Sequence, residues 1–417
     1  PNVADLAADP DPQVRLQVAY SLGEWREAPA ADALNRLLDS DPRDPWIVAA
    51  VHSSLHGENV GEVLQHRLQQ LGPSDILSAE NRQLVRQTLR MADIHLWHLF
   101  DDYLILDPTQ QELAKWQLEL WSEVSEFALR EPARLNDHEF RTVQAGVLER
   151  VIRGLESADV DRDWQVYGLE LLGHAPDPAR VLPCVQNSLR PQVALTGQQA
   201  ALRAWARLAR PGVLSVSEAY CQSFPEWTPI IQDQAIKLAQ TNPQLTTALL
   251  RAIAARQVPE NVLDPSSRQF FLEHPTEAVR QLAAQVFTAA GPGQWQERFP
   301  QYLNLNVGDG NAEHGQAVFR QHCAVCHRIG GHGYVVGPDL RALTDLSVTG
   351  LLASILDPHA ALDTRYAAYV ALTSDGQVIT GMMQEESTNS VTLVGQEGKK
   401  YQLLRNEIDE LRRTGKS

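Results

Sequence analysis

Apolar residues recur with the period of an amphipathic helix through the first three hundred positions of the chain. Val14, Val18 and Leu22 follow a run of aspartates and prolines at 9–12, and a similar run at 41–45 precedes the next apolar stripe. An aspartate before the first turn and a proline within it mark a helix start, and apolar residues four apart share one helical face. The pattern therefore predicts a succession of amphipathic helices.

The helical pattern also repeats along the chain. Helical pairs of fixed period bury their apolar faces only against their neighbours, which predicts an α-solenoid. The stretches at 11–19 and 275–284 resemble a helix of HEAT repeats, whereas the repeat is blurred between about 60 and 160. The resemblance implies a HEAT-like helical repeat domain over residues 1–300. We expect this domain to be a scaffold that offers a surface to a protein partner.

The periodicity changes from helical to alternating towards the C-terminal end. A helix is expected at 349–356, and strand-like alternation begins at 366–373, continues after a turn at 374–377, and ends with a second hairpin at Leu404. Alternating apolar and polar residues on both sides of an Asp-Gly turn predict β-hairpins. We therefore expect a small β-rich insertion at about residues 366–404.

Length and charge exclude some classes of function. The chain has 417 residues and a formal net charge of −16, which predicts two or three domains and makes nucleic acid a poor partner. No uninterrupted apolar run reaches the roughly 20 residues of a transmembrane helix. The chain begins at Pro1 without a signal-peptide pattern, so we expect it to be a piece of a longer precursor.

Cys323, Cys326 and His327 form a C-x-x-C-H sequence, which is the attachment signature of c-type haem. Each thiol can add across one vinyl group of the haem, and the histidine directly after the second cysteine is carried beneath the iron. A neutral imidazole is a good iron ligand when its other nitrogen finds a hydrogen-bond acceptor. We therefore predict one covalently bound haem c, held by both cysteines and with His327 as the metal ligand.

Two other interpretations of the cysteines are weaker. A structural zinc site would need a second ligand pair, but the remaining cysteines, Cys184 and Cys221, are single and distant. A thioredoxin-like thiol pair would need a βαβ setting, which the pattern around the motif lacks. Cys184 and Cys221 could form a disulfide in an oxidising compartment or remain two buried thiols, and the sequence leaves this open.

The residues around the motif resemble a class I cytochrome c. The resemblance rests on Gly315 and Phe319 before the motif and on the Gly-Pro-Asp-Leu sequence at 337–340 after it. It implies that the backbone carbonyl of Pro338 accepts a hydrogen bond from His327, so that Pro338 belongs to the cofactor-binding set. It also implies that Phe319 packs on a terminal helix.

A narrower resemblance includes the β-rich insertion. The Gly-Pro-Asp-Leu sequence is followed by Ile-Leu-Asp-Pro at 355–358, then Tyr366, then Asp-Gly at 375–376. This order is similar to the haem-binding C-x-x-C-H proteins of planctomycetes and verrucomicrobia. Members of that group usually carry an N-terminal β-propeller like that of sugar and sorbosone dehydrogenases. The resemblance implies that the haem accepts electrons from a dehydrogenase domain that precedes Pro1 in a larger membrane-associated or secreted protein.

The sixth iron ligand is not settled by the sequence. In the resembling group a Ser-x-Met-Pro segment follows the β-rich stretch, and this chain stops at Ser417, where that segment would begin. Methionine is the usual sixth ligand of electron-transfer cytochromes. The candidates are Met382 or Met383, a residue beyond Ser417, a histidine such as His332 or His359, or an open site.

Together these observations predict a mainly α protein, with a HEAT-like α-solenoid at 1–300 followed by a cytochrome c domain at 301–417. We expect a periplasmic or otherwise exported electron-transfer module of an oxidoreductase, with a redox partner protein or dehydrogenase domain and no catalytic residue of its own. Two other classes stay open. One is a haem enzyme or sensor with an open sixth site, and the other is a HEAT-repeat interaction scaffold with a structural haem.

Overall fold

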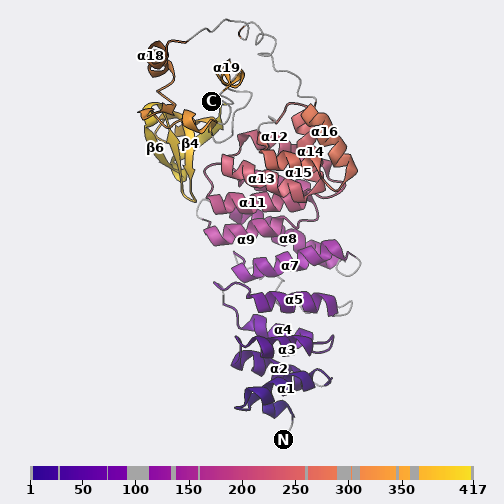
Figure 1. Ribbon diagram of the computed structural model, residues 1–417. Helices are drawn as coiled ribbons and strands as arrows, with labels where there is room; N and C mark the ends of the chain where they lie inside the picture. Colours follow the sequence, from indigo (N-terminus) through magenta and orange to yellow (C-terminus); the bar gives the residue numbers. More distant parts are fainter. Residues whose placement is uncertain are drawn as a thin grey trace. The chain divides into compact units, whose positions relative to one another are not determined.

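The computed structural model is mainly helical and contains a small antiparallel sheet near the C-terminal end (Figure 1). It describes residues 3–26, 29–72, 74–91, 112–132, 138–157, 160–258, 262–288, 302, 310–343, 347–356 and 366–414. Two units can be distinguished, Pro1–Asp177 and Pro178–Ser417, and each is described by itself. The predicted boundary near residue 300 remains a prediction.

The described part of the first unit consists of short helices with N-terminal signals in the sequence. They are a 3-10 helix η1 (Val3–Ala8), α1 (Pro12–Leu22), α2 (Pro29–Ser40), α3 (Pro45–Ser53), α4 (Val60–Gln69), α5 (Ala79–Met91), α7 (Lys115–Arg130), α8 (His138–Leu155) and α9 (Arg162–Leu172). The side chain of Asp11 caps α1 and that of Asp44 caps α3, each with proline at the first helical position. The predicted helix starts after both aspartate–proline runs are therefore confirmed.

Helices of the first unit pack against near neighbours in the sequence. Helix α1 contacts α3, α2 contacts α4, α5 contacts α7, and α7 contacts α9. The shared faces are apolar, and Leu34, Leu37, Ile47 and Trp121 are completely or almost completely buried in them. Since each interface joins helices close in sequence, burial of one apolar stripe per helix is enough to hold each element in place.

The helical part of the second unit follows the same plan. It contains α10 (Pro178–Asn187), α11 (Leu195–Leu208), α12 (Leu214–Ser223), the 3-10 helix η2 (Phe224–Glu226), α13 (Pro229–Thr241), α14 (Pro243–Ala254), α15 (Pro265–Leu272) and α16 (Glu277–Thr288). Trp205 is fully buried at its centre and meets Tyr220 and Trp227 edge-on, with ring centroids 5.8 and 5.7 Å apart. Edge-to-face aromatic pairs of this kind add to the burial of their area.

Cys184 and Cys221 lie in α10 and α12 of this helical part. Both side chains are buried, and no disulfide joins them. Burial raises the pKa of Cys221 to about 12, because a thiolate is poorly solvated among apolar side chains. Of the two alternatives that the sequence left open, the structure shows two buried cysteines.

The C-terminal part of the second unit begins with α18 (Ala312–His322). It continues through β1 (Arg328–Ile329), β2 (His332–Gly333), the 3-10 helix η4 (Leu340–Ala342), α19 (Val348–Leu356), β3 (Ala368–Thr373), β4 (Val378–Glu386), β5 (Ser390–Val394), the 3-10 turn η6 (Gln396–Gly398), β6 (Lys400–Leu404), the 3-10 turn η7 (Arg405–Glu407) and β7 (Ile408–Arg413). The predicted helix before the β-rich region and both predicted hairpins are present.

The sheet has five antiparallel strands in the order β6-β5-β4-β3-β7. The sequence predicted four strands ending at Leu404, and the structure adds β7, which pairs with β3 through Ala371 opposite Leu411. Tyr369, Ala371 and Leu393 are buried in the core of the sheet. A β-rich region with its own core can keep its shape without a cofactor.

A buried ion pair of the sheet lies beside the point where hydrogen bonds join the sheet to the helical part of the second unit. Arg405 and Glu386 are each only 2% exposed, and the guanidinium Nη2 lies 2.6 Å from the carboxylate. Arg405 Nη1 also donates to the backbone carbonyl of Pro191 at 2.7 Å, and the backbone N–H of Leu195 donates to Thr388 O at 3.2 Å. The hydrogen bonds of Arg405 and Leu195 therefore join the sheet to residues 191–195, and Glu386 balances the buried charge of Arg405.

Candidate functional site

The C-x-x-C-H sequence begins where helix α18 ends. Asn311 caps the start of this helix, because its side chain accepts a hydrogen bond from the backbone N–H of His314 at 2.9 Å. At the other end, Cys323 closes the last helical turn, and the backbone N–H of His327 then donates to Cys323 O at 2.8 Å. The two cysteines and the histidine are therefore held on consecutive turns directly after α18.

A glycine-rich loop folds back over the C-x-x-C segment. Strands β1 and β2 pair across it, and Gly330 and Gly331 connect them with positive φ angles of 56° and 86°. The backbone N–H groups of Val336 and Gly337 both donate to the carbonyl oxygen of Cys326, at 3.0 and 2.7 Å. The loop thus returns the chain to the histidine.

The ring of His327 lies against the end of this loop. Its Nδ1 is 2.9 Å from the backbone oxygen of Pro338. A carbonyl can only accept, so Nδ1 carries the proton and Nε2 of the neutral ring is left with a lone pair. The Pro338 carbonyl therefore makes the contact that the resemblance to class I cytochromes c implies, and a neutral His327 ring held in this way would keep Nε2 free for a metal ion.

Gly337 makes this close approach possible. A Cβ atom on Gly337 would lie 2.6 Å from Cε1 and 2.9 Å from Nδ1 of His327, well inside van der Waals contact. Any side chain here would displace the imidazole or the loop. The glycine of the Gly-Pro-Asp-Leu sequence is therefore required by the packing of the histidine ring.

Charged side chains surround the same loop end. The carboxylate of Asp339 accepts hydrogen bonds from Arg328 Nε and Nη2 at 3.1 and 3.0 Å, and from Arg341 Nη2 at 3.1 Å. Hydrogen bonds from Arg341, followed by those from Arg328, hold the pKa of Asp339 well below its usual range. Asp339 is therefore ionised and paired at neutral pH. The pattern of the sequence around the motif does not indicate this role for Arg328 or Asp339.

Cys323 and Cys326 are partly buried and carry free thiols. Burial raises the pKa of Cys326, so its sulfur is protonated at neutral pH. Among the residues that the structure describes, no group of three or more histidine, cysteine, aspartate or glutamate side chains is placed to hold a metal ion.

Several large apolar side chains near the motif are exposed. Helix α18 is amphipathic but has no buried residue, and Phe319 within it is partly exposed. Val318, Tyr334 and Val335 are 42%, 45% and 51% exposed although each carries a large apolar side chain. Exposed apolar side chains near one site are typical of a surface that a ligand or partner covers. A haem attached at the two thiols would supply that cover.

The sheet also contacts the motif, which the sequence analysis did not predict. The backbone N–H of Glu397 in η6 donates to the carbonyl oxygen of Val325, inside the C-x-x-C segment, at 3.2 Å. Glu397 has a positive φ of 59°, an unusual conformation for a residue other than glycine. This contact joins residues that are distant in the sequence. The two glycines at 395 and 398 indicate a tight turn around Glu397, but nothing in the sequence indicates that the turn contacts Val325.

The methionines considered as sixth ligands lie on β4. Met383 pairs with Leu393 and packs against the core of the sheet, whereas Met382 pairs with Val394. Both methionines line a pocket of about 330 Å³ together with Gly337. The two methionines therefore lie near the loop whose end lies against His327. Met383 also contributes to the packing of the sheet. His332 is exposed on β2, and His359 lies outside the described residues.

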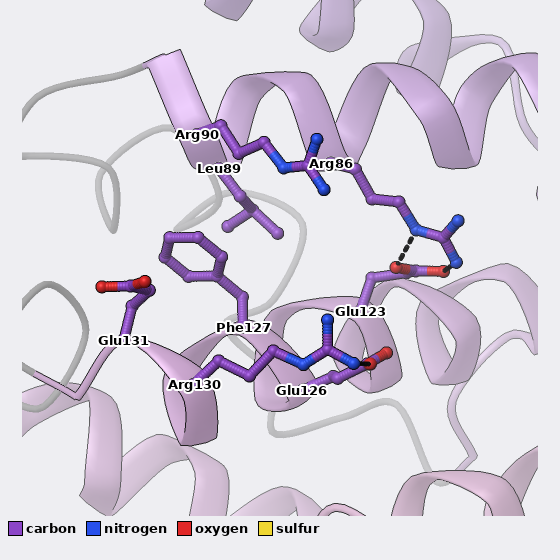
Figure 2. Close-up of a pocket in the computed structure, with 8 residues that line it drawn as sticks. All are labelled: Arg86, Leu89, Arg90, Glu123, Glu126, Phe127, Arg130 and Glu131. Atoms are coloured by element: carbon purple, nitrogen blue, oxygen red, sulfur yellow. Dashed lines mark hydrogen bonds and ion pairs between the residues drawn. The ribbon is translucent and has the colours of Figure 1, made fainter.

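A second pocket, of about 580 Å³, lies between α5 and α7 in the first unit (Figure 2). Its three arginines could suggest an anion site, but the pocket also carries three glutamates. Arg86 binds Glu123 through two hydrogen bonds of 2.7 Å, and Arg130 lies 2.5 Å from Glu126. Charges that compensate each other in this way do not favour an anionic ligand.

One known family matches the part of the chain that contains this site. Residues 312–386, from the start of α18 to the end of β4, match the family model described as Cytochrome c. No curated protein matches the chain. The match supports a class I cytochrome c domain that binds a covalent c-type haem and serves haem-based electron transfer. Within the described residues, no helix is both long and apolar enough to cross a membrane.

Proposed function

We propose that this chain is an exported electron-transfer module whose haem c receives electrons from a sugar or alcohol dehydrogenase domain or partner. In this proposal Cys323 and Cys326 hold the haem through thioethers, His327 ligates its iron, and Pro338 orients the histidine. The observation that carries the proposal is the 2.9 Å contact between His327 Nδ1 and Pro338 O, directly beside two free thiols.

Each residue of the site has a defined task in electron transfer. When bound, haem c supplies a one-electron couple at its iron. Pro338 holds the proton on Nδ1 of His327, which keeps Nε2 available and raises the basicity of the ring. Gly337 lets the loop approach the ring, and Val336 and Gly337 anchor the loop to Cys326 through backbone hydrogen bonds. No acid–base step is needed from these residues, because only an electron moves.

The dehydrogenase donor and the exported location rest on the resemblance of the haem region to the planctomycete and verrucomicrobial C-x-x-C-H proteins. The order of Gly-Pro-Asp-Leu, Tyr366 and the Asp-Gly turn at 375–376 carries it, and the turn is present between β3 and β4. In this proposal the helices before the haem domain are a HEAT-like solenoid, whose near-neighbour packing suits a scaffold that holds the donor.

One observation favours a second candidate, a haem sensor or enzyme with an open sixth site. Met383 packs against the sheet core, so using it as an iron ligand would disrupt that packing. A methionine ligand and an open site differ in their spectra. Methionine ligation gives a low-spin iron that resists carbon monoxide, whereas an open site gives a high-spin iron that binds it.

The test is to produce the chain in a host that attaches haem c and to measure its mass, visible spectrum and midpoint potential. We expect one haem per chain and a reversible one-electron couple. His327→Ala should abolish the native spectrum, and Cys323→Ala should remove one thioether. His314→Ala is the matched control, because His314 is an exposed histidine of α18 whose side chain has no assigned task. Absence of a reversible couple in the loaded protein would refute electron transfer, and carbon monoxide binding would favour the second candidate.

A further inference from the structure

A second pair of residues runs parallel to the contact between His327 and Pro338. Arg328 directly follows His327, and Asp339 directly follows Pro338. Both Nε and Nη2 of Arg328 donate to Oδ2 of Asp339, at 3.1 and 3.0 Å. The histidine–carbonyl hydrogen bond is therefore flanked by an ion pair between the two adjacent residues.

Together with two peptide links, these bonds form a closed cycle. Its sides are the peptide link from His327 to Arg328, the ion pair to Asp339, the peptide link back to Pro338, and the hydrogen bond to the imidazole. Such a cycle restrains rotation of the Pro338 carbonyl, because turning this carbonyl away from Nδ1 would separate the carboxylate of Asp339 from the guanidinium of Arg328. The side chain of Asp339 is 19% exposed and that of Arg328 is 41% exposed, so the ion pair lies at the surface and is held in place by its two hydrogen bonds.

The rest of the loop is held by other means. Val336 and Gly337 are anchored to Cys326 O, and Tyr334 donates to Ala324 O at 3.0 Å. These backbone bonds lie before Pro338 and do not set the direction of its carbonyl. Loss of the ion pair should therefore loosen the histidine contact while the loop itself stays closed.

Arg341 completes the arrangement from the other side. It donates to Oδ1 and Oδ2 of Asp339 through Nε and Nη2, at 3.3 and 3.1 Å. Because Arg341 lies two residues beyond Asp339 on the same segment, it can hold the carboxylate but cannot link that segment to His327. Among the side chains that the structure describes, Arg328 is the one whose hydrogen bonds link Asp339 to the residue next to His327.

We propose that Arg328 is a positioning residue that acts through Asp339 to hold the Pro338 carbonyl against Nδ1 of His327, and so tunes the basicity of the iron ligand. This inference rests on the proposed function, because the tuned quantity is the potential of the bound haem. Outer-shell partners of a ligating histidine commonly act in this way, by fixing the ring orientation and its tautomer.

The experiment compares Arg328→Gln, Asp339→Asn and the double variant in the haem-loaded protein. The first readout is hydrogen exchange of the His327 Nδ1–H in the reduced state. We expect it to accelerate about fivefold in each single variant, since a hydrogen bond is weakened rather than removed, and no further in the double variant. The amide exchange of Val336 and Gly337 should stay unchanged.

The second readout is the midpoint potential of the double variant. Arg328→Gln removes a positive charge and Asp339→Asn removes a negative one, so the double variant keeps the net charge of the site. A weaker hydrogen bond lowers the basicity of the ring and favours the reduced iron. We expect the ratio of reduced to oxidised protein at a fixed potential to rise about threefold in the double variant. Arg320→Gln, an exposed change on α18, is the charge control for Arg328→Gln.

The outcomes are distinct. The positioning role would be overturned if the His327 Nδ1–H exchanged at a rate within twofold of that in the unmodified protein. It would also be overturned if the midpoint potential of the double variant were unchanged. Parallel acceleration of Val336 and Gly337 would also overturn it, because the pair would then hold the whole loop. In haem-free protein the nitrogen chemical shifts of the His327 ring report the same hydrogen bond. A protein without a reversible couple would therefore refute the proposed function and still decide whether Arg328 positions His327.

Discussion

Helices α11 and α18 belong to the same unit and are both amphipathic, yet they differ sharply in burial. Helix α11 buries eight of its residues, with Trp205 and Leu202 completely enclosed, whereas α18 buries none. The apolar face of α11 is covered by neighbouring helices. The apolar face of α18, with Val318 and Phe319, has only partial cover from the protein. The two helices therefore differ in where their core comes from.

The chain therefore completes its apolar cores in two ways. The other helices and the sheet bury apolar surface among their own residues, which stabilises them without a cofactor. The haem segment, residues 312–342, is instead held by backbone hydrogen bonds, an ion pair and one turn from the sheet. Several of its apolar side chains are exposed and would be covered by a bound haem. Haem attachment should accordingly stabilise α18 and leave α11 unaffected.

Removal of the haem should produce the largest difference between α18 and α11. In the Cys323→Ala, Cys326→Ala double variant, the free energy of opening α18 should fall to near zero. In the loaded protein it should approach the global value of about 5–15 kcal/mol. Hydrogen exchange of the α18 amides measures this difference. The amides of α11 serve as the internal reference and should exchange at the same rate in both proteins. Protection of α18 in the haem-free protein would show that the chain covers this helix by itself.

A change in the helical core should give the opposite result. Trp205→Ala removes a fully buried side chain that contacts Tyr220 and Trp227 and whose Nε1 donates to Val216 O at 3.0 Å. We expect a loss of about 3–5 kcal/mol in the free energy of unfolding of the helical part, measured by denaturant titration. Trp46→Ala, at a side chain that is 71% exposed, is the control and should change stability by less than about 0.5 kcal/mol. A shift of the haem potential in Trp205→Ala would contradict the independence of the two cores.

The sequence predicts those features that depend on neighbouring residues. Aspartate and proline fix the helix starts at α1 and α3, and the Asp375-Gly376 turn fixes the first hairpin, where Gly376 has a φ of 82°. The contact between His327 and Pro338 also follows from a short span, because the loop between them closes on itself. Local chemistry was sufficient in each of these cases.

The features that the sequence did not predict depend on distant residues. Strand β7 was missed because Ile408 and Leu411 are three apart, a spacing that also suits a helix, and only pairing with β3 makes the segment a strand. The contact of Glu397 with Val325 and the burial of Arg405 likewise need partners far away in the chain. A charged residue next to a turn is expected to be exposed, and Arg405 is buried because Glu386 and backbone carbonyls satisfy it.

The smallest test compares two glycines of the haem segment. Gly337→Ala would place a Cβ atom 2.6 Å from the ring of His327, whereas a Cβ at Gly315 on α18 would meet no atom within 4 Å. We expect Gly337→Ala to cost about 1–3 kcal/mol by overpacking and to alter the visible spectrum, because the ring must move. Gly315→Ala should instead stabilise α18 by about 0.5–1 kcal/mol, since alanine loses less backbone entropy in a helix. Thermal unfolding and spectra of the loaded proteins measure both effects. If Gly315→Ala were as damaging as Gly337→Ala, the bound haem would cover the face of α18 that carries Gly315, and the apolar cover of this helix would extend beyond Val318 and Phe319.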